Sequence, residues 1–139
     1  MAASSGLAQG DHARRSLSIL LADDDAVIRT ALRVILRPHG HQVEAVGNGR
    51  EVLEALRLRR FDLVLMDIQM PEMGGVEATD RLRRDLPADR QPRVVALSGD
   101  AGPDDREVCR AAGMDDLIAK PLRARDVLRA VDRCYLTAG

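Results

Sequence analysis

The feature that most constrains the fold is a short apolar run, residues 63–66, that leads directly into Asp67 and then into a turn signal at Pro71, Gly74 and Gly75. Four apolar residues in a row predict a strand that is buried on both faces. A carboxylate at the end of such a strand is unusual, because acids rarely lie next to a core. Asp67 therefore either caps the following turn or takes part in chemistry.

Four further apolar runs alternate with stretches that carry apolar residues at helical spacing. The predicted strands are residues 18–22, 42–46, 61–67, 93–98 and 116–120, and the predicted helices are residues 26–37, 50–60, 76–86, 104–112 and 122–136. Strands that alternate with helices predict a parallel sheet with helices on both faces. We therefore expect one α/β domain, residues 17–137, preceded by a flexible N-terminal tail, residues 1–16, that is rich in small and polar residues.

The composition argues against several classes of function. The chain has 21 basic and 22 acidic residues, and its net charge of -1 gives no electrostatic reason to expect binding to nucleic acid or to a membrane. Only Phe61 and Tyr135 are aromatic, which is too few for base stacking. Cys109 and Cys134 lack the spacing of metal ligands, so we interpret them as buried thiols in a reducing compartment. No signal segment or membrane-spanning run is present in the sequence, and we expect a cytoplasmic protein.

Polar side chains stand at the carboxyl ends of four of the five predicted strands. Asp23 and Asp24 follow the first strand, Asp67 ends the third, Ser98 ends the fourth and Lys120 ends the fifth. Parallel α/β sheets bind their ligands beyond the carboxyl ends of the strands. We therefore expect these five side chains to converge on one point.

This set of residues suits phosphoryl chemistry. Carboxylates placed together repel one another and remain ionised only beside a positive charge. Mg²⁺ suits a cluster of oxygen ligands at which phosphate reacts. Three carboxylates, one divalent cation and Lys120 sum to zero charge, so such a site can receive a phosphoryl group. In-line attack of a carboxylate on phosphorus would then give an acyl phosphate, to which Ser98 can donate a hydrogen bond.

Each of these residues also has a purely structural interpretation. Asp67 could cap the next turn, and Ser98 could be an ordinary turn residue at a strand end. Asp25 is expected to cap the helix that follows it, and we leave it out of the site. Lys120 is the only lysine in a chain that otherwise uses arginine, and the two cations are not interchangeable at a phosphoryl site. A single lysine has to stand somewhere, so this last observation adds only modest support.

The motifs at these strand ends resemble those of a known family. Residues 19–25, 65–75, 95–99 and 118–121 are similar, in their order and spacing, to the receiver domain of two-component response regulators. The resemblance extends from residue 18 to about residue 136. It implies a flavodoxin-like (βα)5 three-layer sandwich, in which the five strands of the parallel sheet lie in the order 2-1-3-4-5. It also implies a phosphoacceptor of a two-component or phosphorelay system.

The resemblance implies how the acidic residues divide their roles. Asp67 is expected to be the residue that is phosphorylated. Asp24 and Asp67 are expected to bind Mg²⁺ directly, together with the backbone carbonyl of Gln69. Asp23 is expected to act on the metal through water.

The remaining roles also follow from the resemblance. Ser98 is expected to close onto the phosphoryl group after transfer. Lys120 is expected to bridge Asp67 and the phosphoryl group. The bond between this lysine and the following proline is often cis in this family. Gln69 and Asp100 occupy positions that tune the lifetime of the phosphoryl group. Leu117 stands where many receivers carry an aromatic residue that moves together with the Ser98 position. An aliphatic side chain cannot make that ring movement, so we expect the switch to be coupled differently.

The resemblance also indicates partners. Residues 66–71, 75–79 and 113–116 read like receivers of hybrid histidine kinases and phosphorelays. We therefore expect the phosphoryl group to come from a sensor histidine kinase or a histidine-phosphotransfer protein. We expect this chain to be a signalling protein rather than an enzyme, one that catalyses its own phosphorylation and dephosphorylation. There is no room for a helix-turn-helix module after residue 136, so we expect a stand-alone receiver or a piece of a longer protein, with a protein as any downstream target.

Three alternative functions make different demands on the sequence. A phosphatase of the haloacid dehalogenase type needs a second acid two residues after its nucleophile, and Gln69 stands there. A dinucleotide-binding domain needs glycines after its first strand, where Asp23 and Asp24 would repel a phosphate. A receiver-like module that binds partners without phosphorylation remains open, because Leu117 replaces the usual aromatic residue.

Overall fold

The five predicted apolar runs all form strands in the computed structural model, which describes residues 15–137. The strands are β2 (Ser18–Ala22), β3 (Gln42–Val46), β4 (Leu63–Asp67), β5 (Arg93–Ser98) and β6 (Asp116–Ala119). The helices are α2 (Ala26–Leu36), α3 (Gly49–Leu58), α4 (Gly75–Asp85), α5 (Pro103–Ala112) and α6 (Ala124–Thr137). Two short 3-10 helices that we did not predict, η1 (Arg37–His39) and η2 (Ala88–Arg90), lie in the connections.

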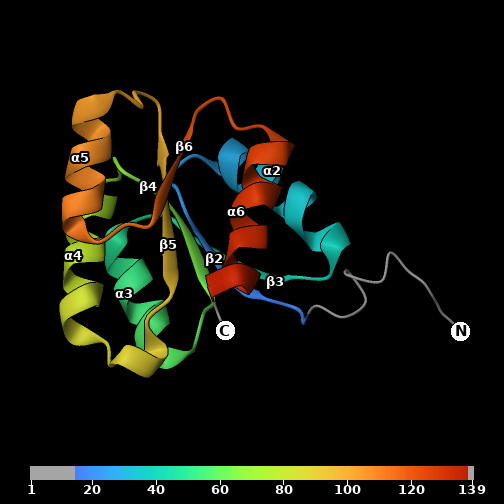
Figure 1. Ribbon diagram of the computed structural model, residues 1–139, viewed down its shortest axis with the longest axis horizontal. Coiled ribbons are helices and arrows are strands. Elements are labelled where there is room, and N and C mark those ends of the chain that lie inside the picture. The colour runs from blue at the N-terminus through green and yellow to red at the C-terminus, as the bar shows by residue number, and fades with distance from the viewer. Residues whose placement is uncertain (1–14, 138–139) are drawn as a thin grey trace, which may run out of the picture.

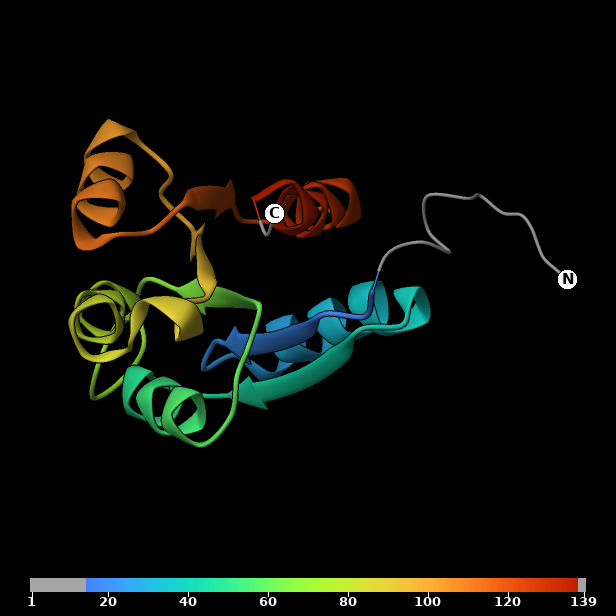
Figure 2. The same cartoon turned by 60° about the horizontal axis from the view of Figure 1, so that its bottom comes forward.

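All neighbouring strands pair in parallel, in the order β3-β2-β4-β5-β6. Counted along the chain this is the order 2-1-3-4-5, so the expected topology is confirmed. Helices α3, α4 and α5 lie on one side of the sheet, and α2 and α6 lie on the other (Figure 1). Figure 2 shows the sheet from another side, from the edge strand β3 to the opposite edge at β6. The three-layer α/β architecture is therefore confirmed as well.

The core has two halves because alternate side chains of each strand point to opposite faces of the sheet. Leu20, Val64 and Val94 belong to the apolar cluster under α3, α4 and α5. Their sequence neighbours Leu21 and Leu65 belong to the cluster under α2 and α6. Since helices cover both faces, a central strand such as β4 is buried at every position, which explains its uninterrupted apolar sequence.

The ends of several elements differ from the prediction by one or two residues. The third strand begins at Leu63 rather than at residue 61, and the last strand ends at Ala119. The last helix begins at Ala124 rather than at residue 122, because its first helical hydrogen bond runs from the amide of Val127 to the carbonyl of Arg123. Such end effects depend on individual backbone hydrogen bonds, which apolar periodicity does not report.

The cap of α2 and the two cysteines are as predicted from the sequence. Asp25 caps α2 as predicted, since its Oδ1 accepts a hydrogen bond from the amide of Val27 at 2.9 Å. Cys109 and Cys134 are both buried free thiols. Of the predicted tail, residues 1–14 lie outside the described part, so its flexibility stays a prediction. No helix within residues 15–137 is long and apolar enough to cross a bilayer.

Arg83 connects α4 to the loops that flank β5 and β6. Its guanidinium donates to the carbonyl of Gly113 at 2.9 Å, to the carbonyl of Pro92 at 2.8 Å and to the carboxylate of Asp115 at 2.9 Å. We expect Arg83→Gln to lower the free energy of unfolding by roughly 2 kcal/mol, because these acceptors lose a charged donor. Urea denaturation of both proteins measures this change.

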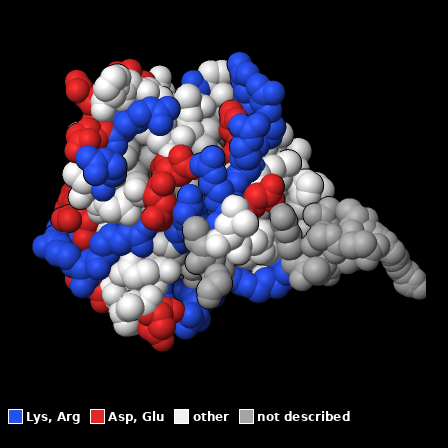
Figure 3. All heavy atoms as spheres, in the orientation of Figure 1, with Lys and Arg blue, Asp and Glu red and all other residues white. Residues whose placement is uncertain are grey.

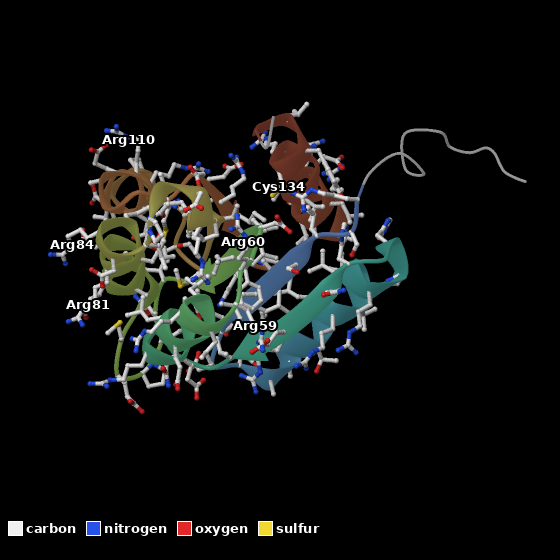
Figure 4. All side chains as sticks on the ribbon, turned by 90° about the horizontal axis from the view of Figure 1, so that it is seen from below. Arg59, Arg60, Arg81, Arg84, Arg110 and Cys134 are labelled. Atoms are coloured by element: carbon white, nitrogen blue, oxygen red, sulfur yellow. The ribbon has the colours of Figure 1, made fainter. Side chains whose placement is uncertain are left out.

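The neighbouring Arg84 provides a matched control. It points away from the molecule (Figure 4), and within residues 15–137 its one ion pair is with Asp80, one helical turn earlier, at 3.0 Å. Arg84→Gln should therefore cost about 0.5 kcal/mol or less. Equal losses in the two variants would show that the contacts of Arg83 add nothing beyond one surface charge.

Candidate functional site

The polar strand ends predicted from the sequence meet at one edge of the sheet. Asp67 is the last residue of β4 and Ser98 is the last residue of β5. Asp23 and Asp24 directly follow β2, and Lys120 directly follows β6. Because β2, β4, β5 and β6 are successive neighbours in a parallel sheet, all five residues lie at its carboxyl edge.

Asp23 is the most deeply buried member of the site, with no exposed surface. Its Oδ1 accepts a hydrogen bond from the amide of Asp25 at 2.9 Å. Its Oδ2 lies 3.1 Å from Lys120 Nζ as an ion pair, yet no donor within residues 15–137 meets this oxygen with hydrogen-bond geometry. A buried carboxylate oxygen without a hydrogen bond is costly, and a bound cation would relieve that cost.

Asp67 lies at the surface of the core and is 7% exposed. Its Oδ1 accepts a hydrogen bond from the amide of Gln69 at 3.2 Å, and its Oδ2 accepts one from Lys120 Nζ at 3.2 Å. Burial and the nearby charge of Asp23 raise the pKa of Asp67, and these two effects exceed the opposing influence of Gln69 and Lys120. A positive charge brought to this site would therefore favour the ionised form of Asp67.

Lys120 joins the two sides of the site through its ammonium group. Nζ lies 3.1 Å from Asp23 Oδ2 and 3.2 Å from Asp67 Oδ2. Burial lowers the pKa of Lys120, but its contacts with the carboxylates of Asp23 and Asp67 together outweigh burial, and the pKa lies above its ordinary value. Lys120 is therefore a charged donor held between two carboxylates. The peptide bond between Lys120 and Pro121 is cis, as expected.

Asp24 completes a group of three carboxylates. Single oxygens of Asp23, Asp24 and Asp67 all lie within 4.8 Å of one another. Asp23 is buried and Asp24 is exposed, so the group spans from the core to the solvent. An all-oxygen donor set of this kind, with an Oδ2 of Asp23 that accepts no hydrogen bond within residues 15–137, fits a hard cation such as Mg²⁺.

A cleft of about 290 Å³ opens beside Asp67. It is lined by Asp67, Ile68, Gln69, Ser98, Gly99, Asp100, Asp105 and Lys120. Gln69 and Asp100 are exposed and line this cleft together with Asp67. Their predicted influence on phosphoryl lifetime stays a prediction.

The loop after Asp67 needs glycine where it returns to the strand. The amide of Gly75 donates to the carbonyl of Ile68 at 2.9 Å and starts α4 directly beside β4. A Cβ atom at Gly75 would lie 2.3 Å from the backbone carbonyl oxygen of Asp67, which is closer than any real contact. The turn signal recognised in the sequence therefore serves the close approach of α4 to β4, the strand that ends in Asp67.

Ser98 is buried, with 3% of its surface exposed, but its hydroxyl does not bond to Asp67. Its Oγ donates to Oδ2 of Asp105 at 2.8 Å and accepts a hydrogen bond from the amide of Asp100 at 3.1 Å. Asp105 also lines the cleft, and it is a residue of the site that was not predicted from the sequence. The only signal in the sequence was an acid in the first turn of the helix after Ser98, a position usually explained by the helix dipole.

Leu117 lies outside this cleft. It is half-buried on β6, is paired in register with Ala96 and packs against the cluster under α3, α4 and α5. It also lines a separate hollow of about 190 Å³ beside α5. Its predicted part in a switch stays a prediction.

The sequence matches a known protein family over most of its length. Residues 19–132 match the family model of the response regulator receiver domain. The chain is 38% identical over 122 residues to the CAI-1 autoinducer sensor kinase/phosphatase CqsS of Vibrio cholerae, covering 88% of this chain and 17% of that protein. It is 37% identical over 122 residues to the transcriptional regulatory protein AfsQ1 of Streptomyces coelicolor, covering 88% of this chain and 52% of that protein. The chain thus spans only part of each relative.

Solved structures show the same fold. The receiver domain of the sensor histidine kinase PA1611 from Pseudomonas aeruginosa, which has a magnesium ion coordinated in its active site cleft, superposes with a TM-score of 0.80 at 32% identity. That alignment covers 88% of this chain and all of the other. The chemotaxis protein CheY4 of Vibrio cholerae superposes with a TM-score of 0.79 at 25% identity, covering 86% of this chain and 99% of the other.

Proposed function

Because this chain belongs to the response regulator receiver domain family, we propose that Asp67 takes a phosphoryl group from a phosphohistidine. A receiver domain is a signalling module of two-component and phosphorelay systems rather than a classical enzyme. The observation that carries the proposal is Lys120, whose ammonium lies within 3.2 Å of both Asp23 and Asp67 at the edge of an open cleft. The alternative, a receiver-like module that works without phosphorylation, is not favoured.

In the proposed transfer, one Oδ of Asp67 attacks the phosphorus atom of the donor. The bond between phosphorus and the imidazole nitrogen breaks, and that nitrogen keeps the electron pair. Lys120 is already within hydrogen-bond distance of Asp67 and can follow the charge onto the phosphoryl oxygens. Ser98 is the second donor, once its hydroxyl turns towards the acceptor.

We assign Mg²⁺ to the three carboxylates as the cofactor. Asp24 and Asp67 would bind it directly with the backbone carbonyl of Gln69, and Asp23 would act through water. The chemistry supplied by a bound Mg²⁺ is neutralisation of the negative charge on the carboxylates and on the incoming phosphoryl group. Two observations support this assignment: the mutual distances of these oxygens, and the lack of a hydrogen bond to Oδ2 of Asp23 within residues 15–137.

The proposed donor is a sensor histidine kinase or a histidine-phosphotransfer protein in the cytoplasm. The relatives in this comparison include a hybrid signal transduction histidine kinase of Dictyostelium discoideum and the kinase BarA of Shigella flexneri. Acidic and basic side chains are interspersed on the face shown in Figure 3, and the net charge is -1. This distribution supports protein partners rather than nucleic acid or a membrane surface.

Phosphorylation should depend on Mg²⁺. We expect incubation with acetyl phosphate and Mg²⁺ to add the mass of one phosphoryl group, and excess EDTA to prevent the gain, because the carboxylates would then repel the donor. Intact-protein mass spectrometry measures both. A wild-type protein that gains no phosphoryl group in Mg²⁺ would overturn the proposed function.

A further inference from the structure

The hydroxyl group of Ser98 is fully engaged in the structure. It donates its hydrogen to Oδ2 of Asp105 at 2.8 Å, and its oxygen accepts the hydrogen bond from the amide of Asp100. A serine hydroxyl has one hydrogen to donate. While Asp105 holds that hydrogen, Ser98 cannot donate it to a phosphoryl group on Asp67.

Asp105 belongs to the wall of the same cleft. It is half-buried in the first turn of α5 and lines the cavity together with Asp67 and Lys120. Phosphorylation converts the carboxylate of Asp67, with one negative charge, into an acyl phosphate with about two, so the cleft gains about one negative charge. The carboxylate of Asp105 therefore opposes phosphorylation in two ways, by repulsion and by competition for the Ser98 hydrogen.

The helix dipole does not account for this contact. Acids in the first turn of a helix are generally favourable, and α5 has two of them, Asp104 and Asp105. Asp104 is exposed and does not line the cleft. Only Asp105 accepts the hydrogen bond from Ser98, so the two acids share the dipole effect and differ in their contact with the site.

We propose that Asp105 is a positioning residue that holds the Ser98 hydroxyl away from Asp67 and so restrains the closed, phosphoryl-bound state. This inference rests on the proposed phosphorylation of Asp67. Transfer of the hydroxyl hydrogen bond from Asp105 to a phosphoryl oxygen is then the step at which the cleft closes. Removing Asp105 makes the hydroxyl available in advance and removes one like charge.

Titration with beryllofluoride in the presence of Mg²⁺ tests the inference, because this probe occupies the position of a phosphoryl group. We expect Asp105→Ala to bind beryllofluoride about tenfold more tightly than the wild type, because the competing hydrogen bond from Ser98 to the charged Asp105 is lost. Amide signals of residues 98–100 in ¹H–¹⁵N spectra measure the binding. Asp104→Ala, which removes the same charge from the same helical turn, should bind like the wild type.

Two further variants separate charge from hydrogen bonding. Asp105→Asn keeps an acceptor but loses the charge, so it should show a smaller gain than Asp105→Ala. In a Ser98→Ala background, Asp105→Ala should lose most of its advantage, since no hydroxyl remains to be released. A role of Asp105 in helix stability alone would leave the gain unchanged by Ser98→Ala.

The outcomes distinguish this inference from the proposed function. If the wild type binds beryllofluoride and Asp105→Ala binds it equally or more weakly, the inference fails while the phosphoacceptor function stands. The same holds if Asp104→Ala gains as much as Asp105→Ala. If neither the wild type nor any variant binds beryllofluoride in Mg²⁺, the proposed function fails and the inference fails with it.

Discussion

Asp67→Asn should abolish the phosphoryl gain completely, because an amide in place of the carboxylate has no anionic oxygen to attack phosphorus. Acetyl phosphate with Mg²⁺ and intact-protein mass spectrometry give the result directly. Asp80→Asn serves as the matched control, since Asp80 is an exposed acid on α4 away from the cleft, and it should be phosphorylated like the wild type. A variant at Asp67 that still gained one phosphoryl group would assign the acceptor to another residue.

The same variant should be more stable than the wild type at neutral pH. The pKa of Asp67 is raised by burial and by Asp23, so the folded state binds a proton more readily than the unfolded state. Stability contributed by this group is then fully present below its unfolded pKa and is lost as the pH rises through the raised folded pKa. Asp67→Asn removes that loss.

The stability gain should therefore be present at pH 7 and should shrink as the pH falls towards about 4, the ordinary carboxyl range. Urea denaturation of both proteins in EDTA, at several pH values, measures it. A gain that did not change with pH would show that ionisation of Asp67 is not its cause. A cooperative unfolding transition of Asp67→Asn in the same experiment would also exclude misfolding as the reason why this variant is not phosphorylated.

Lys120→Gln should slow phosphorylation by roughly 100-fold, as expected when a charged donor aimed at the reacting oxygens is lost. Lys120→Arg keeps the charge, but a planar guanidinium does not fit the place of an ammonium held between Asp23 and Asp67. We expect the Lys120→Arg variant to be phosphorylated about tenfold more slowly than the wild type. Rates of acyl phosphate formation from acetyl phosphate measure both changes.

Two controls make this result specific. Arg125→Gln removes an exposed cation of α6 and should leave the rate unchanged. Mg²⁺ should bind to Lys120→Gln at least as tightly as to the wild type, because Lys120 neutralises the same carboxylates as the metal would. Weak metal binding together with slow phosphorylation would indicate a collapsed site, and full activity of Lys120→Arg would show that only the charge matters.

Most of the site could be predicted because its residues stand at the ends of apolar runs. The run before Asp67 and the glycines after it mark a strand end in the local sequence alone, and the same is true of Ser98 and Lys120. Strand alternation then predicts that these ends share one edge of the sheet. The confirmed strand order places them next to one another as expected.

Asp105 could not be predicted in the same way. Two acids stand side by side at the start of α5, and the sequence does not distinguish them. Which of the two acids contacts Ser98 depends on the rotation of α5 about its axis relative to the sheet. It also depends on the length of the loop between β5 and α5. The buried Oδ2 of Asp23, which accepts no hydrogen bond within residues 15–137, could not be predicted either, since the burial of a single carboxylate oxygen depends on every neighbour around it.

By itself the sequence determined the alternation of strands and helices along the chain, the buried strand that ends in Asp67, and the acids, hydroxyl and ammonium at the strand ends. These features follow from apolar periodicity and turn residues, which act locally. Only the tertiary structure decided that Lys120 lies between Asp23 and Asp67 and that Ser98 donates to Asp105 rather than to Asp67. The reason is physical, because a hydrogen bond requires atoms from separate elements to come within about 3 Å, and only the packing of those elements sets that distance.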